Sequence, residues 1–136
     1  MSSNEEQAQR KYVELQLVMQ HVKELNQQME HAQEQFVETS RLKEYLDDFV
    51  HVKKGDDMYA SIGPGMFVEG TLKETGKVLV NVGGNVVVYK DVKEAQKLVE
   101  KQVNDIQEVL EKMSAELHKV TQHSETVQEE VRKLIG

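Results

Sequence analysis

The sequence predicts an α+β fold with a long antiparallel coiled coil formed within one chain, in the order helix, two β-hairpins, helix. All glycines except the last residue, and the single proline, fall between residues 55 and 84. Since these residue types interrupt regular structure, the flanks on either side are free to be helical. The flanks repeat apolar residues every three or four positions, whereas the middle is rich in valine. We therefore expect the 136 residues to form a single domain with helices over 8–52 and 91–134 and hairpins over 58–89.

The first flank carries one apolar stripe at helical spacing. Its members are Ala8, Tyr12, Leu15, Val18, Val22, Leu25, Met29, Ala32, Phe36 and Thr39. A further set, Leu42, Leu46 and Phe49, follows after one extra step of three residues. Such a step is expected to overwind a coiled coil locally.

The second flank follows a heptad pattern more closely. One heptad position holds Val103, Leu110, Leu117, Ser124 and Val131, and its partner position holds Ile106, Met113, Val120, Val127 and Leu134. Nine of these ten are apolar, which is typical of a coiled coil. Val92, Ala95 and Val99 extend the stripe upstream, and Asp91 with Glu94 resembles a helix-capping pair. Because the two helices have nearly equal length, each is the natural cover for the stripe of the other.

The middle segment predicts four strands, over 58–62, 66–73, 77–82 and 86–89. Each connection between them contains glycine, where a hairpin turn needs positive φ. Short hairpins cannot bury an apolar face alone, and open edges invite pairing with other chains. We therefore expect hairpins from several chains to close into a β-barrel platform. The candidate oligomerisation residues are Met66, Phe67, Val68, Leu72, Val78, Val80, Val82, Val86 and Val88.

Both chain ends fall at the far end of the predicted coiled coil, where additional apolar residues lie outside the seam. Val13, Leu17 and Met19 are examples. These residues either widen the seam or form an adaptable apolar surface for non-native proteins. On the second interpretation, the client-binding candidates are Tyr12, Val13, Leu15, Leu17, Val18, Met19, Val127, Val131, Leu134 and Ile135.

Composition excludes several classes of function. With 24 acidic and 17 basic residues, the formal charge is −7, which argues against nucleic acid as a partner. The absence of cysteine excludes disulfides and thiol nucleophiles. No apolar run is long enough to span a membrane, and the polar, acidic N-terminus does not look like a signal peptide. A cytoplasmic location is expected.

No pattern in the sequence predicts catalysis. The five histidines lack metal-ligand spacing, Asp56 and Asp57 suit a solvated turn, and the glycine-rich turns lack a phosphate-binding sequence. We expect no enzyme activity, no cofactor and no metal.

The central segment resembles the prefoldin family. Ile62–Val68 is similar to the family's first hairpin turn, and Val78–Gly84 followed by Val86–Lys90 is similar to its second hairpin. Asp91–Leu98 resembles the start of its second helix. Four strands indicate the alpha class of the archaeal type, because beta-class chains carry one hairpin. The first strand, Met58–Ile62, departs from the Leu-Val-Pro pattern that is more common there.

This resemblance implies a heterohexamer of two alpha and four beta chains, with six coiled coils around a cavity. It also implies ATP-independent capture of unfolded polypeptides at the coiled-coil tips, followed by transfer to a group II chaperonin. Two other interpretations remain open. One is a structural coiled-coil protein that oligomerises through its hairpins without general chaperone activity. The other, ranked last, is a transcript-cleavage-type factor, which would place both helices before the β domain.

Overall fold

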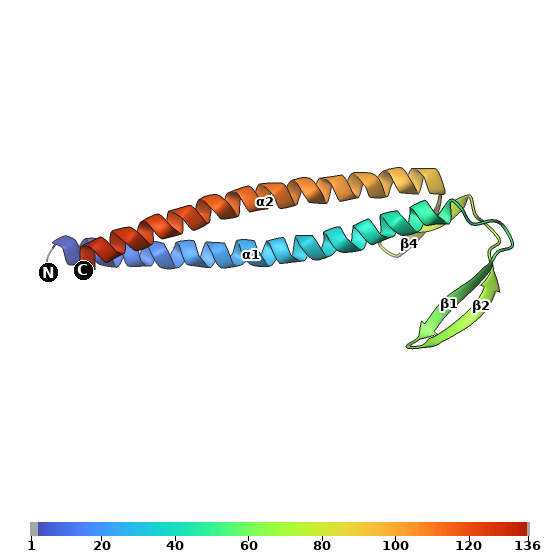
Figure 1. Cartoon of the computed structure of the whole chain (residues 1–136), viewed down its shortest axis with the longest axis horizontal. Coiled ribbons are helices and arrows are strands. Elements are labelled where there is room, and N and C mark those ends of the chain that lie inside the picture. The colour runs from blue at the N-terminus through green and yellow to red at the C-terminus, as the bar shows by residue number, and fades with distance from the viewer. Residues whose placement is uncertain (1–2, 136) are drawn as a thin grey trace. The chain divides into compact units, whose positions relative to one another are not determined.

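The computed structural model describes residues 3–135 and confirms the predicted order of elements (Figure 1). Helix α1 spans Ser3–Phe49 and helix α2 spans Val92–Ile135. Between them lie strands β1 (Asp57–Gly63), β2 (Met66–Thr71), β3 (Lys77–Gly83) and β4 (Val86–Asp91). Helix α1 begins and ends earlier than predicted, and β2 ends before Leu72.

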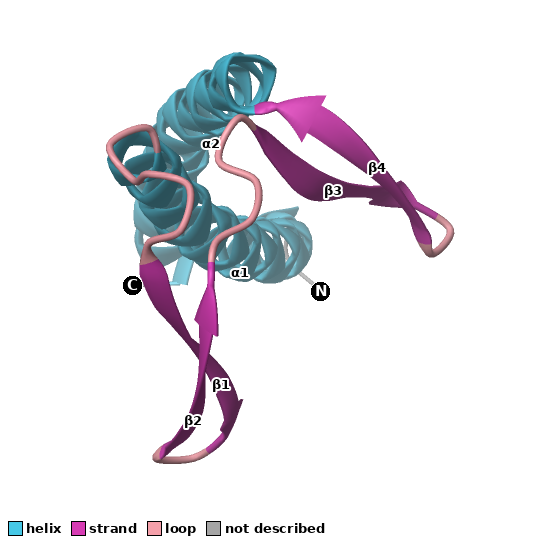
Figure 2. Cartoon of the chain, turned by 90° about the vertical axis from the view of Figure 1, so that its right-hand side faces the viewer, coloured by secondary structure: helices cyan, strands magenta, loops and turns pink. Residues whose placement is uncertain are grey.

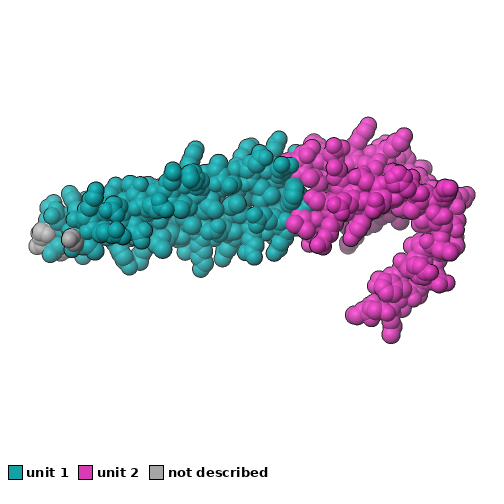
Figure 3. Space-filling model, viewed as in Figure 1, with its two compact units in different colours: residues 1–36, 105–136 teal, residues 37–104 magenta. Residues whose placement is uncertain are grey.

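The chain divides into two compact units (Figure 3). Residues 1–36 and 105–136 form what we call the arm unit, and residues 37–104 form the hairpin unit. The prediction that the whole chain behaves as a single domain stays a prediction.

In the arm unit, the α1 and α2 segments run antiparallel, and both chain ends lie at the same end (Figure 1). Leu15, Val127 and Val131 form a buried cluster between the helices, in which Val127 is 1% exposed. Leu25 and Ala32 continue this core along α1. All ten heptad residues predicted on α2 are buried or half-buried, so that pattern is confirmed.

The predicted stripe on α1 is wrong at two points. Tyr12 and Leu42 are exposed, and the half-buried residues beside them are Lys11 and Lys43. With these two lysines included, the alternation of three and four residues runs unbroken from Ala8 to Leu46. The extra three-residue step, and the overwinding expected from it, therefore do not exist. A lysine can occupy such a position because its aliphatic stem packs while its ammonium group reaches water.

In the hairpin unit, the core joins both helices to one hairpin. Leu46, Ala95 and Val99 form a buried cluster, against which Val78 and Val103 pack. A hydrogen bond from Gln96 Nε2 to Asp47 Oδ1, 3.1 Å long, links the two helices beside this cluster. The root of the β3–β4 hairpin is thus fixed by its own chain.

The strands form two separate antiparallel hairpins, β1–β2 and β3–β4 (Figure 2). At the first turn, Pro64 precedes Gly65 at φ +70°, as a type II turn requires. At the second, Gly84 and Asn85 both have positive φ, as a type I′ turn requires. The expectation of positive φ was wrong for Gly76, because its segment connects two different sheets and makes no hairpin turn.

Candidate functional site

An apolar groove lies between the helix ends of the arm unit. It has a volume of about 430 Å³ and is lined by Ala8, Gln9, Tyr12, Val13, Val131 and Ile135. Ala8 occupies a seam position with a side chain of one methyl group, so α1 does not fill the space in front of α2 there. The groove offers contact to apolar side chains and contains no charged residue.

The predicted client-binding residues divide into three groups around this groove. Five are exposed by 54–71%, namely Tyr12, Val13, Leu17, Met19 and Ile135. Val18 and Leu134 are half-buried in the seam. Leu15, Val127 and Val131 are buried, as their seam positions predict, because they form the core that holds the two helices together. Sequence reasoning missed Ala8 and Gln9 as groove residues, since Ala8 was assigned only to the apolar stripe and Gln9 is polar.

Charged side chains cross-link the helices beside the groove. Lys11 Nζ lies 2.8 Å from Glu130 Oε2 on α2 and 3.3 Å from Glu14 Oε2. His123 Nε2 lies 3.3 Å from Glu14 Oε1. Hydrogen bonding from the Lys11 ammonium lowers the pKa of Glu130, and the same bond raises the pKa of Lys11. Both groups are therefore charged at neutral pH, and the bridge links α1 to α2 beside the buried cluster.

The hairpins present a second apolar surface. Of the nine predicted oligomerisation residues, five are exposed, namely Met66, Phe67, Val68, Val82 and Val86. Leu72, Val78, Val80 and Val88 are half-buried. Val78 packs on the helix cluster of its own chain, so it is already partly covered.

On the β3–β4 hairpin the opposite face is also largely apolar, which sequence reasoning missed. Leu79 pairs with Tyr89 and Asn81 pairs with Val87, on the face opposite the Val80–Val88 pair. Leu79, Val87 and Tyr89 are all exposed. On the first hairpin, Tyr59, Phe67 and Glu69 line a hollow of about 460 Å³. The signal was present in the sequence, because a ribbon with apolar residues at successive positions is typical of burial on both faces.

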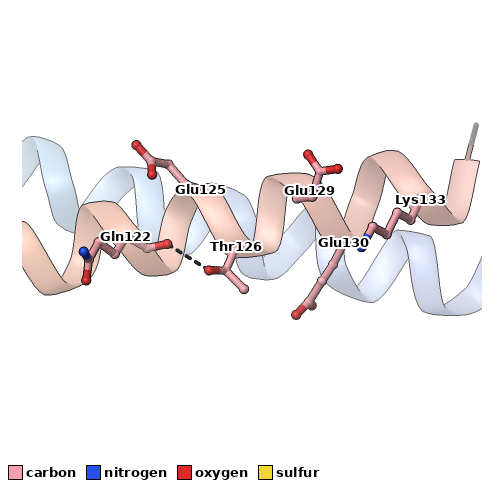
Figure 4. Close-up of a pocket in the computed structure, with 6 residues that line it drawn as sticks. All are labelled: Gln122, Glu125, Thr126, Glu129, Glu130 and Lys133. Atoms are coloured by element: carbon pink, nitrogen blue, oxygen red, sulfur yellow. Dashed lines mark hydrogen bonds between the residues drawn. The ribbon is translucent and has the colours of Figure 1, made fainter.

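A hollow on α2 has the character of a solvated helix surface. It measures about 650 Å³ and is lined only by polar residues of α2, Gln122, Glu125, Thr126, Glu129, Glu130 and Lys133 (Figure 4). Glu125 and Glu129 project to one side of the helix and Glu130 to the other (Figure 4). The one hydrogen bond drawn, from Thr126 Oγ1 to the Gln122 carbonyl oxygen at 3.1 Å, is a local helix contact. This hollow therefore brings no set of carboxylates to a common point.

Among residues 3–135, no three histidine or acidic side chains are grouped so that they could hold a metal ion. None of the helices described there is both long and apolar enough to cross a membrane.

Comparison with known proteins gives consistent matches. A family model described as prefoldin subunit matches residues 18–136. The chain is 29% identical over 97 residues to a prefoldin subunit alpha of Methanobrevibacter smithii, covering 71% of this chain and 66% of that relative. It is 27% identical over 129 residues to the prefoldin subunit alpha of Archaeoglobus fulgidus, covering 95% and 94% of the two chains.

The fold also matches a solved structure. A chain of filamentous PFD from Methanocaldococcus jannaschii, determined by cryo-electron microscopy, superposes with a TM-score of 0.71 at 15% identity. The match covers 85% of this chain and 96% of that one. Prefoldins are non-enzymatic chaperones whose subunits assemble into oligomers, so a chain of this family is a chaperone subunit and not an enzyme. The family match over residues 18–136 and the alpha-subunit relatives together show that the chain belongs to the prefoldin family, as an alpha-class subunit of the archaeal type.

Proposed function

We propose that this chain is a subunit of an ATP-independent holdase, which captures unfolded polypeptides at its arm tips and passes them to a group II chaperonin in the cytoplasm. The observation that carries the proposal is the exposure of Tyr12, Val13, Leu17, Met19 and Ile135 beside an apolar groove. Exposed apolar groups of this kind commonly mark interaction sites. Unfolded chains expose apolar segments that native proteins bury, so an apolar groove selects them.

We further propose that the chain assembles with beta-class chains into a heterohexamer of two alpha and four beta subunits, through barrels built from hairpins. Apolar side chains on both faces of β3–β4 support this, since water covers them in the single chain. The two-stranded sheets also have open edges that can accept further strands.

The capture mechanism is multivalent. Full burial of one large aliphatic side chain contributes roughly 1.5–3 kcal/mol. Association costs roughly 4–15 kcal/mol in lost freedom of movement, so one tip holds a client weakly. Several tips on one platform raise the effective concentration, and the combined affinity can exceed that of a single tip by roughly 10²–10⁴.

An aggregation assay tests this function. The chain is purified with a beta-class prefoldin chain and mixed with a chemically unfolded client in the absence of ATP. The triple variant Val13→Ser, Leu17→Ser, Ile135→Ser should suppress aggregation much less than the parent complex. A matched control carries Val37→Ser and Val109→Ser, which also replace exposed valines but lie away from the tip. Equal suppression by the tip variant and the parent would contradict client capture at the tips.

A second candidate function is that of a structural scaffold which oligomerises through its hairpins. The open hairpin edges and the similarity to a chain of filamentous PFD favour it. A scaffold would assemble normally but would not suppress aggregation. Trimming residues 1–19 and 127–136 would then leave its assembly unaffected, whereas trimming a chaperone abolishes client protection.

A further inference from the structure

Helix α1 carries a second apolar stripe in the hairpin unit, separate from the seam. It consists of Leu42, Tyr45 and Phe49, which we call the Tyr45 stripe. Leu42 is 46% exposed, Tyr45 is 65% exposed, and Phe49 is half-buried. These residues follow one another at steps of three and four, so they share one face of the helix.

The seam with α2 does not use this face. On the same two turns of α1, the seam residues are Lys43 and Leu46, and Leu46 is buried against Ala95 and Val99. The Tyr45 stripe is therefore not an extension of the core between α1 and α2. Its apolar area faces water in the isolated chain, at a position where a polar residue would cost the coiled coil nothing.

We propose that the Tyr45 stripe is a docking surface for the neighbouring prefoldin subunit of the same assembly, which lays the first turns of its own coiled coil against it. This inference rests on the proposed assembly through the hairpins. Heptad-like spacing favours a helix as the occupant, because apolar residues at steps of three and four form a seam for another helix. The tyrosine suits an interface, since its ring packs while its hydroxyl group can remain in water.

Continuity with the hairpins favours a sibling subunit over a client. Tight turns follow Phe49 directly, with hydrogen bonds from His51 N to Asp48 O (3.1 Å) and from Val52 N to Phe49 O (3.2 Å). The connection is then tied to the end of β2, since Gly55 N donates to Leu72 O at 2.7 Å. A second backbone hydrogen bond, 2.9 Å long and donated by Leu72 N to Asp56 O, links the same two segments. The end of the stripe at Phe49 thus lies six residues before the segment bonded to the root of hairpin β1–β2, which places a subunit docked on that hairpin near the stripe.

Single-cysteine spin labels test the proposal, because the chain contains no cysteine of its own. Leu42→Cys and Tyr45→Cys place labels on the stripe. Val37→Cys is the matched control, since Val37 is 48% exposed on the same helix and in the same unit but is not part of the stripe. Each labelled chain is assembled with a beta-class prefoldin chain, and label mobility is measured by electron paramagnetic resonance. We expect immobilisation at residues 42 and 45 and free motion at residue 37.

A second measurement gives the energetic consequence. The double variant Leu42→Ser, Tyr45→Ser should raise the concentration at which the complex half-dissociates by about tenfold or more, whereas Val37→Ser should change it less than about twofold. Helix melting should be unchanged in both, because neither variant alters the seam.

The outcomes separate this inference from the proposed function. Mobile labels at residues 42 and 45 in a fully formed complex would overturn the docking surface and leave the hairpin platform intact. Immobilisation that appears only when an unfolded client is added would overturn it too, because the stripe would then be a client site. Failure of any complex to form would overturn both proposals.

Discussion

At the scale of single residues, Lys11 links the two helices at the arm tip, beside the buried core. It occupies a seam position and bridges to Glu130 on the other helix at 2.8 Å. The bridge lowers the pKa of Glu130 and raises that of Lys11. A carboxyl group with a lowered pKa adds stability above its ordinary value, and an ammonium group with a raised pKa adds stability below its ordinary value. The bridge thus contributes fully only when the pH lies between these two values.

The pH dependence of Glu130→Gln tests this bridge. We expect the parent to melt at a higher temperature than the variant by a constant amount from about pH 5 to about pH 10. The difference should shrink as the pH falls from the ordinary value of 4.5 through the lower pKa that Glu130 has in the folded chain, and as it rises from 10.5 through the higher pKa of Lys11. Glu125→Gln is the control, since Glu125 is exposed on the same helix. A difference that is flat across the whole range would contradict the bridge.

Ser124 is the single polar member of the ten heptad residues on α2, and it is half-buried. Ser124→Leu should increase the unfolding free energy of the coiled coil by about 1 kcal/mol, because added methylene groups are buried between the helices. Circular dichroism melting measures the change. Ser114→Leu is the control, since Ser114 is exposed and should give no gain. Equal melting of the two variants would show that the seam is open at Ser124.

At the scale of elements, the sequence predicted helices and hairpins well because glycine and proline separate them sharply. All internal glycines lie between residues 55 and 84, a segment that contains strands β1, β2 and β3, and β4 follows it directly. The heptads of α2 could be read directly, because nearly every seam residue is apolar. The seam of α1 could not be read in this way, because two of its positions hold lysines. Lys11 and Lys43 count as charged residues in a sequence pattern, although their aliphatic stems pack in the seam.

The candidate surfaces were predicted less completely than the elements. Spacing placed Leu15, Val127 and Val131 in the stripes between the helices, where the structure buries them, so these three client-binding candidates have the least surface to offer a client. On β3–β4, only one face was recognised, although Leu79 and Tyr89 make the other face apolar as well. Alternate apolar residues predict one buried face, and this prediction overlooked that the intervening residues of β3–β4 are also apolar.

The second face of β3–β4 leads to an element-scale prediction. If assembly covers both faces, Leu79→Ser with Tyr89→Ser should weaken the complex with beta-class chains about as much as Val80→Ser with Val88→Ser. Each pair removes two cross-strand apolar partners. Native mass spectrometry over a dilution series measures the loss. If only the Val80 pair weakens the complex, the outer face stays in water after assembly.

At the scale of the whole molecule, client capture should depend on the number of tips held together and not only on the chemistry of each tip. Val80→Asp with Met66→Asp places charges on both hairpins without altering any tip residue. We expect this variant to remain helical, to fail to assemble and to suppress aggregation at least about tenfold less than the parent at equal chain concentration. Far-ultraviolet circular dichroism checks the helices, and sedimentation velocity checks the oligomeric state. Full suppression by a dispersed, helical chain would show that a single arm suffices, and that the platform serves a purpose other than multivalent capture.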